Sequence, residues 1–389
     1  MTDGTRRNVV WLGTVSFFAD VAGEMIAPIL PLFLTVTLGA PATAVGLVDG
    51  SAELAASAFR AVGGWWSDRA GRRKPTVLLG YSLSALAKPL LALAGTWPLV
   101  VFVRVLDRTG KGLRGTARDA LIASSVEKEH WAGAFGLHRA MDTAGAVLGP
   151  LLALWLMEGW GLGHRGIFAV ATVPALASVA VVVLFVREAR PAGAAPAPVP
   201  APAPGPRPAL TRSFWSFLAI YGVFALGNSS DSFLLLKARQ SGLAESLVIL
   251  AYVLYNLVNA SLAPWVGRRA DRLGRRRTVA AGFAVYALCY LGFALSGPSG
   301  LWPLFALYGL HAALVEGSLR AVVSQFSEEG NRGTAHGVFQ AVAGALGFSA
   351  SVLAGELWVR VSPAAPFWLG AACAVLSSAA LFVFSRSRA

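Results

Sequence analysis

Twelve stretches of mostly apolar residues follow one another along the chain, separated by short polar segments. A helix that crosses the hydrocarbon core of a bilayer needs about 20 such residues. The pattern therefore predicts an all-α polytopic membrane protein with twelve transmembrane helices. The expected spans are residues 9–36, 43–66, 75–95, 98–122, 131–157, 165–187, 213–238, 244–266, 278–297, 301–326, 333–358 and 364–385.

One polar segment occurs twice. Residues 64–73 read GWWSDRAGRR and residues 267–276 read GRRADRLGRR, so both copies have the form G-x-x-x-D-R-x-G-R-R. The copies are 203 residues apart in a chain of 389 residues. A loop signature repeated at about half the chain length indicates two homologous halves.

The two halves are separated by a segment rich in proline and alanine, residues 191–208. Proline at this density disfavours a helix and favours an extended, semi-rigid spacer. We therefore expect an N-terminal six-helix bundle over residues 1–187, a cytoplasmic linker over residues 188–212 and a C-terminal six-helix bundle over residues 213–389.

Composition and charge support a membrane protein. Hydrophobic residues make up 56% of the chain and charged residues only 14%, against about 25% charged in soluble domains. The net charge of +13 reflects basic residues that collect in alternate loops, as cytoplasmic loops require, rather than a nucleic-acid partner. We expect a multi-pass protein of a prokaryotic inner membrane, with both termini cytoplasmic.

The doubled loop motif, the twelve spans, their division into six and six and the central linker resemble the major facilitator superfamily. The resemblance implies two pseudo-symmetric six-helix bundles, alternating access and a functional monomer. It also implies a cytoplasmic gate in which Asp68 and Arg72 latch the helix ends, with Asp119 as a further candidate. The other gate positions are Gly64, Arg69, Gly71, Asp271 and Arg272. Alternatively, the arginines only set the topology.

Two further motifs are partial matches to this family. The fourth span contains Arg104, Gly110 and Gly112 of the pattern R-x-x-x-G-x-G-x-G, but Arg108 replaces its first glycine. The fifth span contains Gly145, Gly149 and Pro150 as G-x-x-x-G-P. This sequence resembles the core of a motif associated with exporters, although a packing face of small residues with a proline bend is the simpler interpretation.

Charges within the spans of the first half are the most informative feature below the level of the family. The acidic residues are Asp20, Glu24, Asp49, Glu53, Asp107 and Asp142, and the basic residues are Arg60, Arg104, Arg108, Lys111 and Arg139. Each unpaired charge costs about 2.5–3.5 kcal/mol at the bilayer centre. The eleven together would cost on the order of 30 kcal/mol, more than a domain's whole stability, so they must face one another or water.

Two interpretations of these charges remain open. They form ion pairs that fix the helix register, or some of them carry protons, because a carboxylate in a low-dielectric site holds a proton more readily. The proton-carrying candidates are Glu24, Asp49, Glu53, Asp20 and Asp142, the last also as an orienting partner of Arg139. The cavity candidates are Arg104, Arg108, Lys111, Arg139, Asn228, Asp231, Asn256, Asn259, Glu316 and Gln340. His138 and Asp142 lie four residues apart and could both bind a metal ion, but the sequence offers no third ligand beside them, so we expect no metal site.

These features predict a secondary active transporter that exports a small molecule in exchange for protons. The alternative is import of an organic anion or an anionic metal chelate, which the basic stripe of the fourth span favours. The sequence gives little support to a third function, a membrane-embedded receptor or enzyme on the same scaffold, because it contains no G-x-S-x-G, H-E-x-x-H or Walker sequence. We expect no cofactor and no metal, only a small-molecule substrate, protons and the bilayer.

Overall fold

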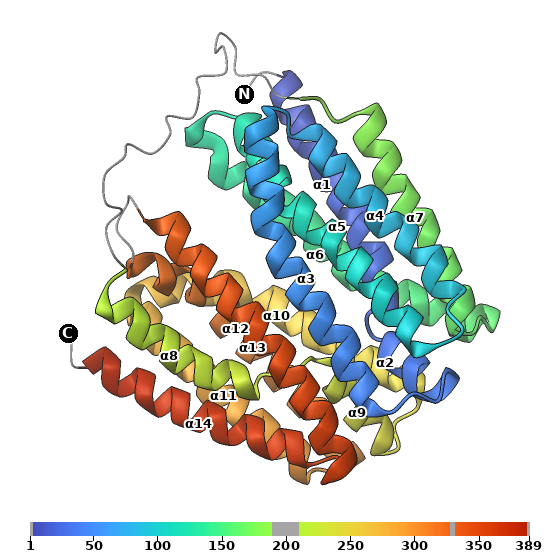
Figure 1. The fold of residues 1–389 in the computed structure, drawn as a ribbon, viewed down its shortest axis with the longest axis vertical. Helices are drawn as coiled ribbons and strands as arrows, with labels where there is room; N and C mark the ends of the chain where they lie inside the picture. The colour runs from blue at the N-terminus through green and yellow to red at the C-terminus, as the bar shows by residue number, and fades with distance from the viewer. Residues whose placement is uncertain (1–2, 189–209, 327–330, 387–389) are drawn as a thin grey trace. The chain divides into compact units, whose positions relative to one another are not determined.

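The computed structural model describes residues 3–188, 210–326 and 331–386, and these residues are almost entirely helical (Figure 1). The expected linker falls mostly on residues 189–209, outside the described residues. The helices of the first half are α1 Asp3–Ile26, α2 Leu30–Leu32, α3 Ala42–Ala70, α4 Lys74–Ala92, α5 Trp97–Ser124, α6 Trp131–Trp160 and α7 His164–Leu184. Those of the second half are α8 Arg212–Gly227, α9 Ser232–Gln240, α10 Glu245–Leu273, α11 Arg275–Leu295, α12 Leu301–Gln325, α13 Arg332–Arg360 and α14 Ala365–Arg386.

Each expected span is confirmed as helix, but the first and the seventh are interrupted. The first breaks after α1 at Pro28, which has no N–H to continue the helical hydrogen bonds, and ends in a π-helical turn at Phe33–Thr37. The seventh breaks between α8 and α9, at Asn228–Asp231. The 203-residue offset of the loop motif relates Pro28 to Asp231, so the two halves share this break.

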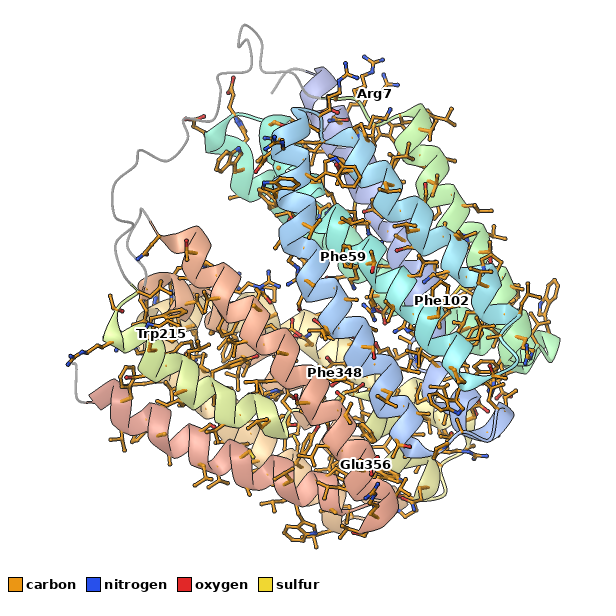
Figure 2. All side chains as sticks on the ribbon, viewed as in Figure 1. Arg7, Phe59, Phe102, Trp215, Phe348 and Glu356 are labelled. Carbon is orange, nitrogen blue, oxygen red and sulfur yellow. The ribbon has the colours of Figure 1, made fainter. Side chains whose placement is uncertain are left out.

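Eight helical segments of the described residues are long and apolar enough to cross a membrane by length and composition alone. The four other long helices, α3, α4, α5 and α12, complete the set of twelve. Phe102 and Trp215, labelled in Figure 2, are 61% and 52% exposed. Large apolar side chains exposed on a helix are what a lipid-facing surface requires.

The contacts group the chain into two compact units, Met1–Ile29 with Ser51–Pro206, and Leu30–Gly50 with Arg207–Ala389. The boundary cuts α3 because its first turns pack on α13. A Cβ atom on Gly50 would lie 3.1 Å from the Phe348 carbonyl oxygen, and one on Gly355 would lie 2.7 Å from the Thr43 Cα atom. Glycine therefore permits this close helix approach. The domain limits expected from the sequence stay a prediction.

In the first unit, α1 packs against α6 and α7, and α4 packs against α5 and α7 (Figure 1). Buried apolar side chains join these helices, among them Leu12, Val15, Val77 and Leu121. The second unit has an aromatic core in which the Phe224 and Phe283 rings stack with centroids 3.9 Å apart. The helices that carry the charged residues of the first unit are thus held together by an apolar core.

Candidate functional site

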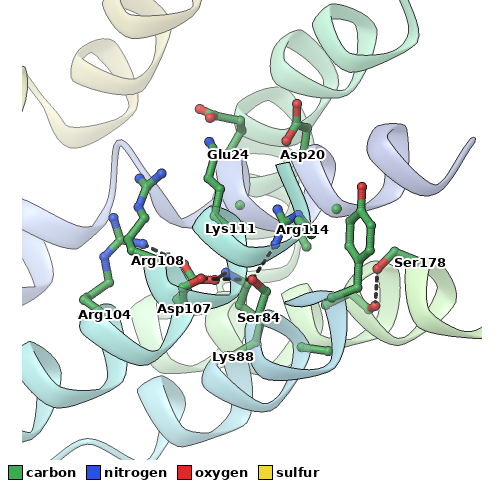
Figure 3. A pocket seen from close by; sticks show the side chains of 16 residues that line it. Asp20, Glu24, Ser84, Lys88, Arg104, Asp107, Arg108, Lys111, Arg114 and Ser178 are labelled. Carbon is green, nitrogen blue, oxygen red and sulfur yellow. Dashed lines mark hydrogen bonds and ion pairs between the residues drawn. The ribbon is translucent and has the colours of Figure 1, made fainter. Parts of the chain in front are cut away.

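A charged cavity lies in the first unit, among α1, α4, α5 and α7 (Figure 3). Its empty volume is about 480 Å³, including the part open to solvent. The lining residues are Ala19, Asp20, Ala22, Gly23, Glu24, Tyr81, Ser84, Ala85, Lys88, Arg104, Asp107, Arg108, Lys111, Arg114, Ala175 and Ser178. Three of the basic cavity candidates from the sequence, those on α5, are therefore brought together here.

Asp107 lies at the centre of a buried ion-pair cluster. Its Oδ1 atom is 3.2 Å from Lys88 Nζ and its Oδ2 atom is 3.1 Å from Arg104 Nη1. The side chains of Lys88, Arg104 and Asp107 are only 5%, 6% and 11% exposed. Each oxygen of the Asp107 carboxylate thus forms an ion pair with one cation. Charges can be buried in this way because each has a hydrogen-bonded partner of opposite sign.

Arg114 is held on the opposite side of this cluster by α4. Its Nη1 atom donates to Ser84 Oγ at 2.6 Å, and its guanidinium carbon lies 4.4 Å from the centroid of the Tyr81 ring. A Cβ atom on Gly80 would lie 2.6 Å from the Gly110 carbonyl oxygen, so glycine is required for this approach of α4 to α5. The family glycine at 110 thereby positions the basic residues that flank it.

Arg108 occupies the position where the family pattern has its first glycine. The structure places Arg108 half-buried in the lining of the cavity (Figure 3). One helical turn on, Lys111 is exposed at the cavity and interacts electrostatically with the carboxylates of Asp20 and Glu24. Compared with the family pattern, the cavity therefore has one additional cation.

Asp20 of α1 and Asp142 of α6 form a pair of carboxyl groups. Their side chains hydrogen-bond to each other, and Asp142 Oδ2 also accepts from Arg139 Nη1 at 3.2 Å. Arg139 is 69% exposed at its side chain, whereas Asp142 is 18% exposed. A hydrogen bond between two carboxyl groups requires that one of them carry a proton, so this pair is a place where a proton can be held.

The fifth-span motif sets the distance between these two helices. A Cβ atom on Gly145 would lie 2.6 Å from the Phe17 carbonyl oxygen, and one on Gly149 would lie 2.7 Å from that of Val21. The same Cβ atoms would lie 3.2 Å from the Asp20 Cβ and 2.9 Å from the Glu24 Cβ. The motif glycines therefore bring α6 against the acidic face of α1.

A second buried polar cluster is centred on Ser16 of α1. Ser16 Oγ accepts from Arg118 Nη1 at 3.0 Å and lies 2.8 Å from His138 Nε2 and 3.2 Å from the Tyr81 hydroxyl. His138 and Asp142 lie one turn apart on α6. In the described part of the chain, no group of three His, Cys, Asp or Glu side chains could hold a metal.

The other two carboxylate candidates of the first half lie elsewhere. Asp49 belongs to the second unit, where its Oδ2 atom accepts from the hydroxyls of Ser230, at 2.6 Å, and Ser232. Glu53 is exposed. Of the proton-carrying candidates Glu24, Asp49 and Glu53, only Glu24 lines the cavity.

The cavity candidates of the second half are dispersed over the α8–α9 break, α10, α12 and α13. Asp231 accepts from the Tyr308 hydroxyl at 2.6 Å, and Asn256 donates to the Tyr252 carbonyl. Asn228, Asn259 and Gln340 are half-buried, and Glu316 is exposed. Their part in substrate binding stays a prediction.

Comparison with known proteins decides the family. The family model described as Major Facilitator Superfamily matches residues 12–352. The chain belongs to the major facilitator superfamily (MFS). It is an integral membrane transporter rather than an enzyme, and it has the MFS fold of twelve transmembrane helices in two six-helix bundles.

Several proteins match this MFS transporter over most of its length. An uncharacterized MFS-type transporter of Methanocaldococcus jannaschii is 35% identical over 95% of this chain and 93% of its own. The multi-drug resistance efflux pump PmrA of Streptococcus pneumoniae is 23% identical over 82% of this chain and 80% of its own. The structure of the nucleoside transporter NupG is 14% identical, with a TM-score of 0.79 over 98% of this chain and 100% of that chain.

The gate motif of this MFS transporter lies at the α3–α4 turn. Gly71 adopts a φ of +61°, which glycine allows without a steric penalty, while Asp68, Arg69 and Arg72 are exposed. Asp119 of α5 pairs with Arg118 at 3.0 Å. In the second copy Arg272 is exposed, and the Asp271 side chain lies outside the described residues. The latch between the halves stays a prediction.

Three further side chains contribute to the cavity or to the α3–α4 turn and were not predicted from the sequence. Lys88 and Arg114 line the cavity, and Lys88 had a visible signal, since it is the one lysine inside the third span. Glu188 has no such signal. Its carboxylate oxygens accept from the backbone N–H groups of Arg73 and Lys74, both at 2.8 Å, where the dipole of α4 favours a negative charge.

Proposed function

We propose that this MFS transporter is a secondary active transporter in which proton movement drives the export of a small molecule by alternating access. The observation that carries the proposal is the hydrogen-bonded pair of Asp20 and Asp142, because Asp20 also lines the cavity. A proton bound by the pair would therefore change the charge of the cavity wall, and with it the affinity of the cavity for a charged substrate.

The pair has the properties that a proton carrier needs. Two carboxylates in contact repel each other when both are ionised, so one proton is retained, and a nearby cation favours its release. Arg139 contacts Asp142, and Lys111 interacts with Asp20. A change of access that moves these cations relative to the pair would load or unload the proton.

Two observations support export as the direction. The G-x-x-x-G-P sequence at Gly145, Gly149 and Pro150 resembles the core of an exporter motif, and its glycines pack against the α1 backbone beside Asp20 and Glu24. A relative over most of the chain is the efflux pump PmrA. In this proposal, protons enter down their gradient as the substrate leaves.

Cotransport of a proton with an organic anion is the second candidate function. It is favoured by the cavity lining, which has five basic side chains and three acidic ones. Protonation of a carboxyl group raises the positive charge of the cavity and strengthens anion binding, so proton and anion would move in the same direction.

Proteoliposomes distinguish these functions. Vesicles loaded with labelled succinate, glycerol 3-phosphate or ethidium are placed in acidic medium. Release of the labelled probe is measured, and the luminal pH is measured at the same time with the dye pyranine. Export in exchange for protons predicts faster release of a transported probe together with luminal acidification. Cotransport predicts that the inward proton gradient drives uptake instead. Flux that is indifferent to the gradient would remove the coupling.

Asp20→Asn and Asp142→Asn identify the carrier. We expect both variants to lose the effect of the proton gradient while still exchanging labelled for unlabelled probe, because the amide keeps a hydrogen bond but cannot titrate. Glu158→Gln is the matched control, since Glu158 is an exposed carboxylate on the same helix, α6. Coupling that persists in both asparagine variants would move the carrier to another residue.

We also propose an inner-membrane location with both termini cytoplasmic, and a functional monomer. The excess of lysine and arginine in alternate loops supports this orientation. Labelling of single cysteines placed in the α3–α4 turn and in the α1–α3 connection tests it. An impermeant reagent added to intact cells should reach only the second site.

A further inference from the structure

The cavity of the first unit carries an excess of positive charge. Five basic side chains line it, against the carboxylates of Asp20, Glu24 and Asp107. The lining therefore has an excess of two positive charges. Including Asp142 and its partner Arg139 adds one charge of each sign and leaves this excess unchanged. The proton shared by Asp20 and Asp142 increases it further, so the lining is cationic in each protonation state.

The acids of the lining are already engaged with cations. Asp107 contacts Lys88 and Arg104 with its two oxygens, and Asp20 and Glu24 interact with Lys111. The positive charges of the lining still outnumber these carboxylates, so an anion that enters the cavity would be attracted. Burial of an uncompensated charge is strongly unfavourable in a low-dielectric site.

The basic groups are also placed as an anion-binding set. Arg104, Arg108 and Lys111 follow one another at spacings of four and three residues, which puts them on one face of α5. Figure 3 shows them around the same cavity as Arg114. Arginine forks bind carboxylate and phosphate oxygens with paired hydrogen bonds, and the ring of Tyr81 fixes the orientation of Arg114.

We infer that this cavity binds the transported substrate through a carboxylate or phosphate group, so that the substrate class is a small organic anion. The inference rests on the proposed transport function and adds the chemistry of the ligand. It distinguishes this transporter from pumps for cationic drugs, because a cation in the same cavity would be repelled by the excess positive charge.

Equilibrium binding to the purified full-length protein in lipid nanodiscs tests the inference. Thermal unfolding is measured with succinate and glycerol 3-phosphate as anionic probes, glycerol as a neutral probe and ethidium as a cationic probe, at constant ionic strength. A ligand that binds the folded state raises the unfolding midpoint with its concentration. We expect a saturable rise with at least one anionic probe and no rise with glycerol or ethidium.

Variants locate the site. Arg108→Ala should weaken the anion's apparent affinity about tenfold or more, the size expected for a charge-assisted hydrogen bond. Arg108→Lys should retain part of it. Arg360→Ala is the control, because it removes one exposed positive charge of the second unit, paired with Glu356, and we expect it to leave the affinity unchanged.

Three outcomes would overturn the inference. They are equal or greater stabilisation by ethidium or glycerol, absence of stabilisation by both anions, or an Arg108→Ala protein that binds the anions as the wild type does. These outcomes are separable from failure of proton coupling. Anion binding without any effect of a proton gradient on flux would remove the coupling alone, whereas gradient-driven flux of ethidium would remove the anion class alone.

Discussion

Lys88 Nζ and Asp107 Oδ1 form an ion pair across α4 and α5 with a separation of 3.2 Å, and both side chains are almost fully buried. Arg104 contacts the second oxygen of the same carboxylate. This cluster joins two helices of the cavity wall and fixes the position of the basic residues on α5. The positions of Lys88 and Arg104 in the cavity wall therefore depend on Asp107.

Replacement of Asp107 should be costly. Asp107→Asn leaves two buried cations facing a neutral amide, and we expect the free energy of unfolding in mixed detergent micelles to fall by about 3–5 kcal/mol, the range for breaking a buried pair. The double variant Asp107→Asn with Lys88→Met should recover part of this lost stability, because Lys88→Met removes one of the two uncompensated charges.

The exposed pair of Glu356 and Arg360 is the control for that measurement. Its side chains are 39% and 78% exposed, and exposed pairs contribute at most about 1 kcal/mol. Glu356→Gln should therefore change little. A double variant at Lys88 and Asp107 that is no more stable than Asp107→Asn alone would contradict the central place given to this acid.

A side chain at Gly149 should separate α6 from α1. Gly149→Ala puts a Cβ atom 2.7 Å from the Val21 carbonyl oxygen, and the forced displacement should cost about 1–3 kcal/mol, measured as a lower unfolding midpoint. Gly136→Ala on the same helix is the control, since no atom beyond its chain neighbours and its own helix backbone lies within 4 Å of its Cβ position. Equal effects of the two variants would show that helix propensity, not packing, is responsible.

Glu188 should hold the α3–α4 turn in place. Loss of its carboxylate in Glu188→Ala removes the acceptor of the Arg73 and Lys74 N–H groups, at a cost of about 1 kcal/mol by comparison with helix caps. We expect faster trypsin cleavage at the basic residues 69–74, with Glu188→Gln intermediate. Glu127→Gln, at a side chain 81% exposed, should leave the rate unchanged.

Asp49 should stabilise the break between α8 and α9. Asp49→Ala removes the acceptor of the Ser230 and Ser232 hydroxyls, and bonds to a charged group contribute about 1.5–3 kcal/mol each. Asp49→Asn keeps one acceptor oxygen and should cost less. In a protein that already carries Ser230→Ala and Ser232→Ala, Asp49→Ala should have little further effect on the unfolding midpoint. An undiminished effect there would assign Asp49 to other contacts.

The sequence by itself determined the class and the fold of this protein. Runs of apolar residues long enough to cross a bilayer set the twelve helices, and the repeated motif at Gly64 and Gly267 set their division into halves. These features are local or periodic in the sequence, so they can be recognised without knowledge of the tertiary contacts. The sequence also placed the stripe of Arg104, Arg108 and Lys111 on one helix face, because spacing alone defines a face.

Only the tertiary structure decided which charges meet. Spacing predicted that Asp20 and Glu24 share a face and that Asp142 is close to Arg139, but contacts between helices brought Asp20 to Asp142 and Lys88 to Asp107. They also gave Asp49 its serine partners at the α8–α9 break, and Glu188 its partners at the start of α4. The energy of a buried charge depends on partners from distant segments, and helix packing alone selects them.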